Sequence, residues 1–262
     1  MNTTTVISKF GKITLFPINS LQSFLTFCKA VFLGMINPTI KMRLLFQQLE
    51  FVGNQSFGII LLAGSMVGAI FGIQLGIIFK IFGAESMIGA AAGFGLSREL
   101  APVIGAFLVT GRAGSAMAAE LGTMRVNEQI DAMRVMAVNP YNYLVAPRVI
   151  AAILMMPILV IFFVVSGVLA SFIIASTFYQ VDTAEFLAKI QWVVAPKDLF
   201  DGCVKATVFG FIFSTIGCYQ GFNASGGAKG VGEATTKAVV ISYVAILSAD
   251  YFITYLQFYI SS

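Results

Sequence analysis

Long charge-free stretches limit the fold of this chain more than any other feature. Between Glu50 and Lys80 no Asp, Glu, Lys or Arg occurs, a run of about 29 residues, or about 43 Å of helix at 1.5 Å per residue. A bilayer core is about 30 Å thick, and about 20 apolar residues span it as a helix. Because backbone groups in lipid must be hydrogen-bonded within the segment itself, this run predicts a transmembrane helix.

The composition extends this conclusion to the whole chain. Hydrophobic residues make up 58% of the sequence and charged residues 11%, whereas soluble domains are about 25% charged. The 262 residues therefore suit one bundle of about five spanning helices. The predicted fold is an all-α membrane protein with a single domain, in which residues 1–48 form an interfacial helix region and residues 49–262 the transmembrane bundle.

The beginning of the chain has the pattern of a helix that lies on the membrane. Residues 1–17 lack the basic, apolar and small-residue order of a cleaved signal peptide. From Asn19 to Met35, apolar residues recur at helical spacing, and Asn37-Pro38 is expected to end the helix. The apolar positions are Leu21, Phe24, Leu25, Cys28, Phe32 and Met35.

Four further spans are expected at residues 87–122, 148–181, 199–219 and 237–260. The first of these is too long for one simple crossing, so we expect a short entry piece followed by a spanning helix. The second is free of charge for about 33 residues and contains Pro157, where a kink is possible. The last is interrupted by Asp250.

Two adjacent charges, Arg98 and Glu99, stand in the otherwise apolar second span. A charge at the bilayer centre costs at least about 2.5 kcal/mol on insertion scales, so it needs a partner, a cavity or the interface. Neighbours on a helix point about 100° apart, so these two side chains cannot pair face to face. They are either helix-end anchors or groups beside a polar-headed substrate or a gate.

The first span carries two distinct faces. Gly64, Gly68, Gly72 and Gly76 recur every four residues and favour close helix packing. Beside them is a bulky apolar face that either contacts lipid or lines a site for a lipid-like ligand; it consists of Phe71, Leu75, Ile78 and Phe82. Small residues between Gly111 and Gly122 likewise favour tight packing, within the chain or across a dimer axis.

Residues 124–136 form a charged amphipathic segment after the second span. Arg125, Glu128, Asp131 and Arg134 alternate in sign, which is typical of a short helix outside the bilayer. It is either a solvated connector or a docking surface. The cytoplasmic side is expected to carry more basic residues, which places this segment and the N-terminus in the cytoplasm and the C-terminus outside. The inside set is Lys9, Lys12, Lys29, Lys41, Arg43, Arg125, Arg134, Arg148, Lys229 and Lys237; the outside set is Lys80, Lys189 and Lys197.

Several kinds of chemistry are excluded. The chain contains no histidine, and Cys28, Cys203 and Cys218 match no zinc, haem or redox spacing, so no metal or cofactor is predicted. In the glycine-rich segment 223–233, interpreted as a flexible cytoplasmic turn, Glu233 and Ala234 stand where a nucleotide loop needs Lys and Ser or Thr. The basic residues form no single patch, so no nucleic-acid partner is expected. The chain itself is therefore not predicted to be an enzyme.

Three runs, SRELAPV, TGRAGSAMAAELGTMRVNEQIDAMRVMAVNP and ATTKAVV, resemble the MlaE/YrbE family. Members are permease subunits of MCE-linked ABC lipid transporters. The resemblance implies a homodimer with two cytoplasmic ABC ATPase subunits and a hexameric periplasmic MCE-domain protein. It also implies a place in the bacterial inner membrane and phospholipid movement between that membrane and the MCE assembly, supporting outer-membrane lipid asymmetry.

The resemblance also assigns residues. Phe71, Ile78, Phe82, Glu99 and Leu100 would line or border an apolar phospholipid pocket, with Arg98 beside them and Leu75 on the same helical face. Residues 124–136 would be the coupling helix that contacts the ATPase, including Arg125, Glu128, Gln129, Asp131 and Arg134.

The chain departs from some relatives, which have arginine where it has Gln47 and Lys237. An ammonium does not replace a bidentate guanidinium on phosphate, so the headgroup preference stays open. Two other functions are left as alternatives. One is a proton-coupled secondary transporter that uses Glu99 and Asp250, although no internal repeat supports it. The other is a structural membrane scaffold.

Overall fold

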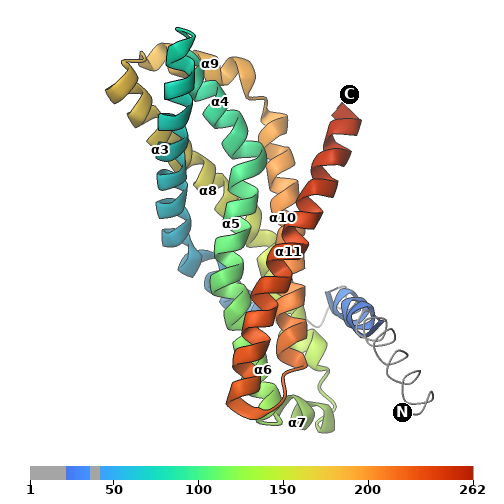
Figure 1. The fold of residues 1–262 in the computed structure, drawn as a ribbon. Helices are drawn as coiled ribbons and strands as arrows, with labels where there is room; N and C mark the ends of the chain where they lie inside the picture. The colour runs from blue at the N-terminus through green and yellow to red at the C-terminus, as the bar shows by residue number, and fades with distance from the viewer. Residues whose placement is uncertain (1–21, 36–41, 262) are drawn as a thin grey trace, which may run out of the picture.

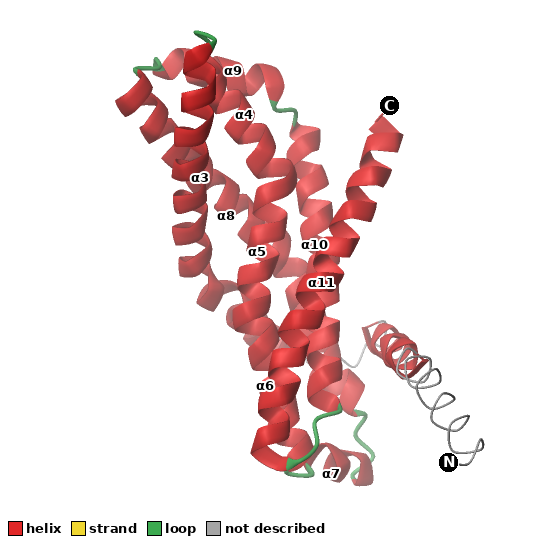
Figure 2. Ribbon diagram, in the orientation of Figure 1, coloured by secondary structure: helices red, strands yellow, loops and turns green. Residues whose placement is uncertain are grey.

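The structure is a computed structural model that describes residues 22–35 and 42–261. Within these ranges every regular element is a helix, as expected, and five helices are long and apolar enough to cross a membrane (Figures 1 and 2). The predicted start of the interfacial helix at Asn19 and its end at Asn37-Pro38 lie outside the described residues.

The first spanning helix packs directly on the third. It comprises α2 (Met42–Leu49), the π-helical turn η1 (Glu50–Asn54) and α3 (Gln55–Ile81). Its glycine stripe faces α8 (Ala146–Tyr179), and a Cβ atom on Gly68 would overlap the carbonyl group of Gly167. The predicted packing role of these glycines is therefore confirmed, and it operates within one chain.

The second span is one helical path, so the predicted division into an entry piece and a spanning helix is wrong. Two π-helical turns, which each insert one extra residue into a turn, lie within this path without interrupting it. The path consists of η2 (Glu85–Met87), α4 (Ile88–Gly95), η3 (Leu96–Leu100), α5 (Ala101–Val109), η4 (Thr110–Gly114) and α6 (Ser115–Val126).

The rest of the chain adds three spans and two short connecting helices. These are α7 (Gln129–Val135), η5 (Tyr141–Val145) leading into α8, α9 (Thr183–Val193), α10 (Pro196–Phe222) and α11 (Gly227–Ser261). The flexible turn predicted over residues 223–233 is corrected, because α11 already begins at Gly227. The segment 124–136 is likewise not one helix: α6 continues to Val126, and α7 starts only at Gln129.

The bundle has two distinct ends (Figure 1). The α9 helix lies beside α4 at one end, while α6 and α7 meet at the other. The largest core cluster lies between the second span, α8 and α10, around Met117, Phe163, Phe209 and Phe213. The α11 helix diverges from the bundle toward the C-terminus, and only 11% of its most apolar stretch is buried.

The N-terminal helix, Gln22–Met35, rests against the α7 end of the bundle. Phe27 and Val31 are buried there, although neither belongs to the predicted apolar face. Leu25 and Phe32, which do belong to it, are each 59% exposed. The helix therefore has two apolar faces, one on the protein and one available to lipid.

Candidate functional site

The positions of Arg98 and Glu99 follow from a proline one turn later. Pro102 has no N–H to donate to the carbonyl of Arg98, and its ring crowds that carbonyl. The helix widens at this point into the π-helical turn η3, which contains both charged residues. Such turns change the direction in which side chains leave a helix, and they are frequent at functional sites.

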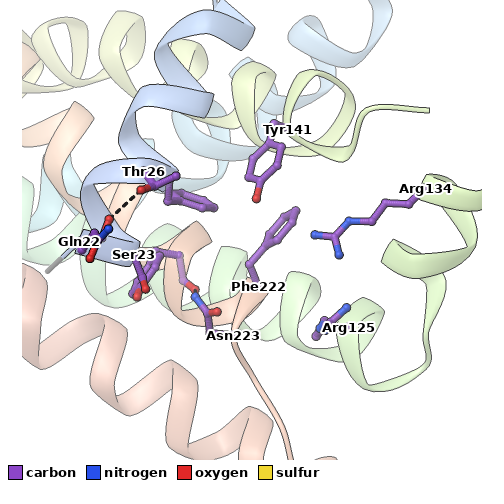
Figure 3. Close-up of a pocket in the computed structure, with 10 residues that line it drawn as sticks. Gln22, Ser23, Thr26, Arg125, Arg134, Tyr141, Phe222 and Asn223 are labelled. Atoms are coloured by element: carbon purple, nitrogen blue, oxygen red, sulfur yellow. Dashed lines mark hydrogen bonds between the residues drawn. The ribbon is translucent and has the colours of Figure 1, made fainter. Parts of the chain in front are cut away.

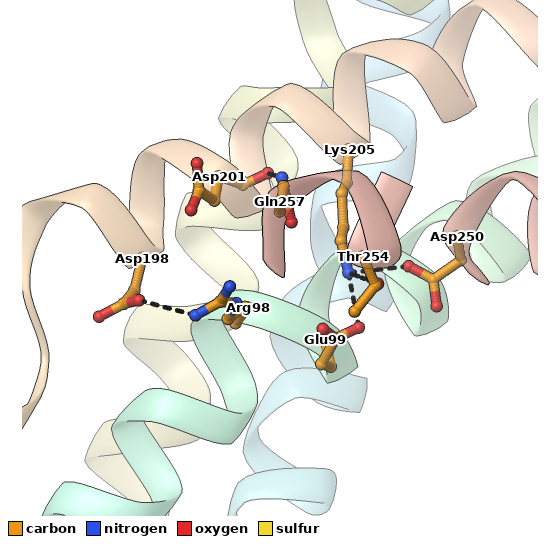
Figure 4. A network of polar contacts seen from close by, with 8 residues as sticks. All are labelled: Arg98, Glu99, Asp198, Asp201, Lys205, Asp250, Thr254 and Gln257. Atoms are coloured by element: carbon orange, nitrogen blue, oxygen red, sulfur yellow. Dashed lines mark hydrogen bonds and ion pairs between the residues drawn. The ribbon is translucent and has the colours of Figure 1, made fainter. Parts of the chain in front are cut away.

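Glu99 points toward a lysine buried inside the membrane-spanning bundle (Figure 4). Lys205 on α10 has no exposed surface; its Nζ donates hydrogen bonds to Glu99 Oε2 at 2.6 Å and to Thr254 Oγ1 at 2.7 Å. Asp250 Oδ1 lies 3.0 Å from the same nitrogen, held by charge attraction without a well-directed hydrogen bond. One cation thus ties together η3, α10 and α11.

Arg98 makes a separate contact on α10. Its Nη1 lies 3.5 Å from Asp198 Oδ1, and its guanidinium group lies 5.6 Å from the centre of the Phe94 ring. The other carboxylate oxygen of Asp198 accepts a hydrogen bond from the backbone of Ala195 and so caps the first turn of α10. The prediction that Arg98 and Glu99 cannot pair with each other is confirmed, since each has its own partner.

The α3 helix, which carries most of the predicted apolar face, lies on the other side of the second span from α10 and α11 (Figure 1). Phe71 approaches Gly95, where an added Cβ atom would lie 3.1 Å from the ring. Leu75 packs against the cluster around Ile88, whereas Ile78 and Phe82 are 51% and 76% exposed. Leu100 is partly buried against the main core. Within one chain, therefore, the apolar face packs partly on the helix that carries both charges and is partly exposed.

Two further cations, partly buried Arg112 and buried Arg148, join the spans nearer the α7 end. Arg112, in the π-helical turn η4, donates hydrogen bonds to the Phe51 carbonyl, to Ser56 Oγ at 3.0 Å and to Gln55 Oε1. Arg148 donates to Glu120 Oε2 at 2.9 Å. These contacts hold the second span to α3 and α8, so we assign them a structural role.

The five residues predicted for ATPase coupling divide into two groups. Arg125 Nη1 donates to both oxygens of Asp131, at 2.7 and 2.6 Å, and Arg134 Nη1 donates to Oδ1 at 3.2 Å. Glu128 and Gln129 are exposed, and Glu128 has a left-handed backbone with φ of 58°. The first group fixes the turn between α6 and α7, whereas the second group is presented outward.

An apolar anchor and an exposed apolar tip complete this end. Ile130 is fully buried against Leu121, so α7 is attached to the bundle. Val135 and Met136 are 88% and 67% exposed. A short helix that is fixed on one side and exposes apolar residues on the other is suited to contact another protein.

No residues within 22–35 and 42–261 form a group of three or more His, Cys, Asp or Glu that could hold a metal ion. The three cysteines are free thiols: Cys218 is buried, while Cys28 and Cys203 are partly exposed. Burial raises the pKa of the Cys28 thiol, which makes it a poor nucleophile at neutral pH.

Sequence reasoning missed three of these partners: Lys205, which pairs with Glu99, Thr254, which accepts a hydrogen bond from Lys205, and Asp198, which pairs with Arg98. A signal was available for Lys205, because it is a charge within a predicted span, the same feature that identified Arg98 and Glu99. The pairing itself was not visible, since Glu99 and Lys205 are 106 positions apart in the chain.

The family match and three similar proteins agree with one another, since each is described as a permease. Residues 45–256 match the family described as Permease MlaE. A probable ABC transporter permease protein of Rickettsia conorii is 40% identical over 97% of this chain and 98% of its own length. A probable ABC transporter permease protein of Synechocystis is 42% identical over 87% of each chain. The intermembrane phospholipid transport system permease protein MlaE of Haemophilus influenzae is 34% identical over 82% of this chain and 83% of its own length.

Proposed function

The chain belongs to the MlaE permease family, and from that premise we propose that it is the permease subunit of an ABC transporter that moves phospholipids. The match over residues 45–256 carries this proposal, because it includes all five candidate spans in whole or in large part. The phospholipid substrate is taken from the name of the Haemophilus influenzae relative.

The proposed assembly supplies an ATPase, for which no nucleotide-binding motif was recognised in this sequence. A homodimer in the bacterial inner membrane would bind two cytoplasmic ABC ATPase subunits and, on the periplasmic side, a hexameric MCE-domain protein, with the N-terminus in the cytoplasm. Phospholipid would pass between the membrane and the MCE protein and so support outer-membrane asymmetry. The sparse burial of α11 leaves apolar surface for a second copy or for lipid, which is compatible with this arrangement.

We assign the substrate site to the apolar face of α3 together with η3. Acyl chains would contact Phe71, Ile78 and Phe82, of which the last two are exposed. Burying acyl chains is favourable by about 0.8 kcal/mol per CH₂ group. Arg98 and Glu99 would act in gating, because their ion pairs connect η3 with α10. Lys205, the partner of Glu99, also pairs with Asp250 on α11, so these contacts must change if the helices move apart.

The substrate site can be tested with two neighbouring isoleucines of similar exposure. Ile78 is 51% exposed on the proposed face, and Ile77 is 57% exposed about 100° away. Ile78→Gln places an unpaired amide against acyl chains, at about 1–3 kcal/mol, so ATP-dependent transfer of a fluorescent phospholipid should fall about tenfold. Ile77→Gln is the matched control. Equal transfer by the two variants would contradict the assigned face.

Coupling to an ATPase is tested best at Glu128. Reversing Asp131 would also break its contacts with Arg125 and Arg134, whereas Glu128 is exposed. With the ATPase partner present, Glu128→Lys should lower lipid-stimulated ATP hydrolysis about tenfold while the protein keeps its thermal stability. Unchanged hydrolysis would remove this residue from the contact.

The proton-coupled alternative predicts that lipid transfer requires a pH gradient instead of ATP. Glu99 and Asp250 do converge, but on Lys205, so binding a proton would disrupt an ion pair. If lipid transfer in liposomes followed a pH gradient without ATP or an ATPase subunit, the ABC mechanism would be abandoned.

A further inference from the structure

A polar cavity lies at the α7 end of the bundle, far from the proposed substrate site (Figures 1 and 3). It has a volume of about 380 Å³ and lies between the N-terminal helix, the end of α6, α7, η5 and the end of α10. Neither the proposed substrate site nor Glu128, the residue chosen to test the ATPase contact, lines it.

Two arginines provide positive charge in this cavity. Arg125 and Arg134 line it and share one carboxylate, Asp131, so the three side chains together carry one net positive charge. The hydrogen bonds to Asp131 all come from the Nη1 atom of each arginine. A guanidinium group has five N–H donors and matches the oxygens of a phosphate group in a bidentate manner. The cavity is therefore suited to an anion that can accept several hydrogen bonds.

The opposite wall is aromatic. Phe27 packs edge-on against Tyr141 at 5.6 Å between ring centres, and Tyr141 stacks on Phe222 at 5.4 Å. Phe27 and Phe222 are buried, whereas the Tyr141 hydroxyl points toward the cavity (Figure 3). Polar Thr26 forms part of the rim on the N-terminal helix. Cations and hydroxyl groups beside an aromatic wall suit a ligand that has an anionic headgroup and an apolar remainder.

The adjoining sequence cannot fill the cavity with a carboxylate. Residues 1–49 contain no Asp or Glu, and their basic residues are Lys9, Lys12, Lys29, Lys41 and Arg43. Basic segments next to a spanning helix are attracted to anionic lipid surfaces, at about 1 kcal/mol per basic residue. The same region of the chain thus brings the cavity to an anionic membrane surface.

We propose that this cavity binds the phosphate group of an anionic phospholipid from the leaflet on the α7 side. The site is distinct from the transport site. If the proposed orientation is right, this leaflet is the cytoplasmic one; the binding site itself does not rest on the orientation. Because Arg125 and Arg134 also fix the turn before α7, a bound phosphate ties the N-terminal helix to the segment proposed to contact the ATPase. Free phosphate offers the same chemistry, so the test separates the two sources.

The test uses the full chain in phosphatidylcholine nanodiscs that contain phosphatidylglycerol with a photoactivatable group beside its headgroup. Crosslinked peptides are identified by mass spectrometry. Arg134→Gln removes one cation, and Thr26→Asp adds a negative charge at the rim without changing either arginine. Both should lower crosslinking to residues 22–35 about tenfold. Lys29→Gln, an equal change of charge on the exposed side of the same helix, should lower it by no more than about twofold.

Each outcome has a defined meaning. Loss of crosslinking in both variants supports the site; if millimolar inorganic phosphate also competes, free phosphate is a ligand, and if it does not, the lipid is. Equal crosslinking in all variants overturns the proposal. Loss of crosslinking when the ATPase subunit is added also overturns it, because an acidic side chain of that partner would then occupy the cavity. Crosslinking to peptides from α3 reports on the transport site separately. Absence of crosslinking to α3 alone would therefore count against the proposed function and not against the anion-binding cavity.

Discussion

At the scale of single residues, the charges inside the membrane span are arranged as a network. A fully buried ammonium group is tolerated only with compensating charge and hydrogen bonds, and Lys205 has two carboxylates and the hydroxyl of Thr254. The network spans three helices, so any rearrangement of α11 relative to η3 must change these contacts. This is the property expected of a gate.

We expect Lys205→Met to destabilise the protein. The change leaves Glu99 and Asp250, whose side chains are 40% and 20% exposed, without their counter-charge. Breaking a fully buried ion pair costs about 3–5 kcal/mol, and partial exposure of the two carboxylates reduces this to about 1–3 kcal/mol. The free energy of unfolding in detergent micelles measures the effect. A triple variant that adds Glu99→Gln and Asp250→Asn removes the uncompensated charges and should recover more than half of the loss. If the single and triple variants unfold alike, the destabilisation comes from lost packing instead.

At this scale the sequence revealed the cost of the charges but not their partners. Arg98 and Glu99 could be singled out because an apolar run makes any charge conspicuous. Their partners, Asp198 and Lys205, depend on which helices are neighbours, and apolar periodicity carries no information about that. The same limit explains Phe27 and Val31, which were left off the predicted apolar face because contact with the bundle, and not with lipid alone, determines their burial.

At the scale of helices, small residues and prolines determine how the spans fit together. The glycines of α3 permit backbone contact with α8, and Gly217 on α10 approaches the carbonyl of Gly114, where an added Cβ atom would lie 2.9 Å away. The glycine stripe was predictable because its period is that of a helix. The π-helical turn η3 was not, since Pro102 is compatible with a kink, a break or a widened turn.

Two glycines of the same helix give a matched test of this packing. Gly68→Ala introduces a Cβ atom onto the Gly167 backbone, which cannot move away cheaply, so the free energy of unfolding should fall by about 1–3 kcal/mol. At Gly58 no atom lies within 4 Å of an added Cβ. Gly58→Ala should therefore be neutral or stabilise by up to about 1 kcal/mol through helix propensity. Thermal unfolding in detergent measures both, and a destabilised Gly58→Ala with a neutral Gly68→Ala would contradict the packing.

At the scale of the whole molecule, the five candidate spans are an odd number, so the N-terminal helix and the end of α11 lie at opposite ends of the bundle. The basic residues Arg125, Arg134 and Lys229 are near the α7 end, whereas Lys189 and Lys197 are near the α9 end. More basic residues are found on the cytoplasmic side of membrane proteins, so the distribution favours a cytoplasmic α7. The spans themselves were predictable from apolar runs, but the order in which helices pack was not.

This orientation can be measured with two exposed positions at opposite ends. Trp192 near the end of α9 is 77% exposed and Met136 after α7 is 67% exposed, so a cysteine at either should react readily. In a background with the three native cysteines changed to alanine, a membrane-impermeant maleimide applied to the periplasmic face should label Trp192→Cys and spare Met136→Cys. Permeabilising the membrane should make both react, which controls for access. A separate variant that keeps Cys28 and lacks the other two cysteines should, after permeabilisation, react more slowly than either at neutral pH, because burial raises the pKa of the Cys28 thiol and less of it is thiolate. Labelling of Met136→Cys alone in intact membranes would reverse the proposed orientation and move the anion-binding cavity to the opposite leaflet.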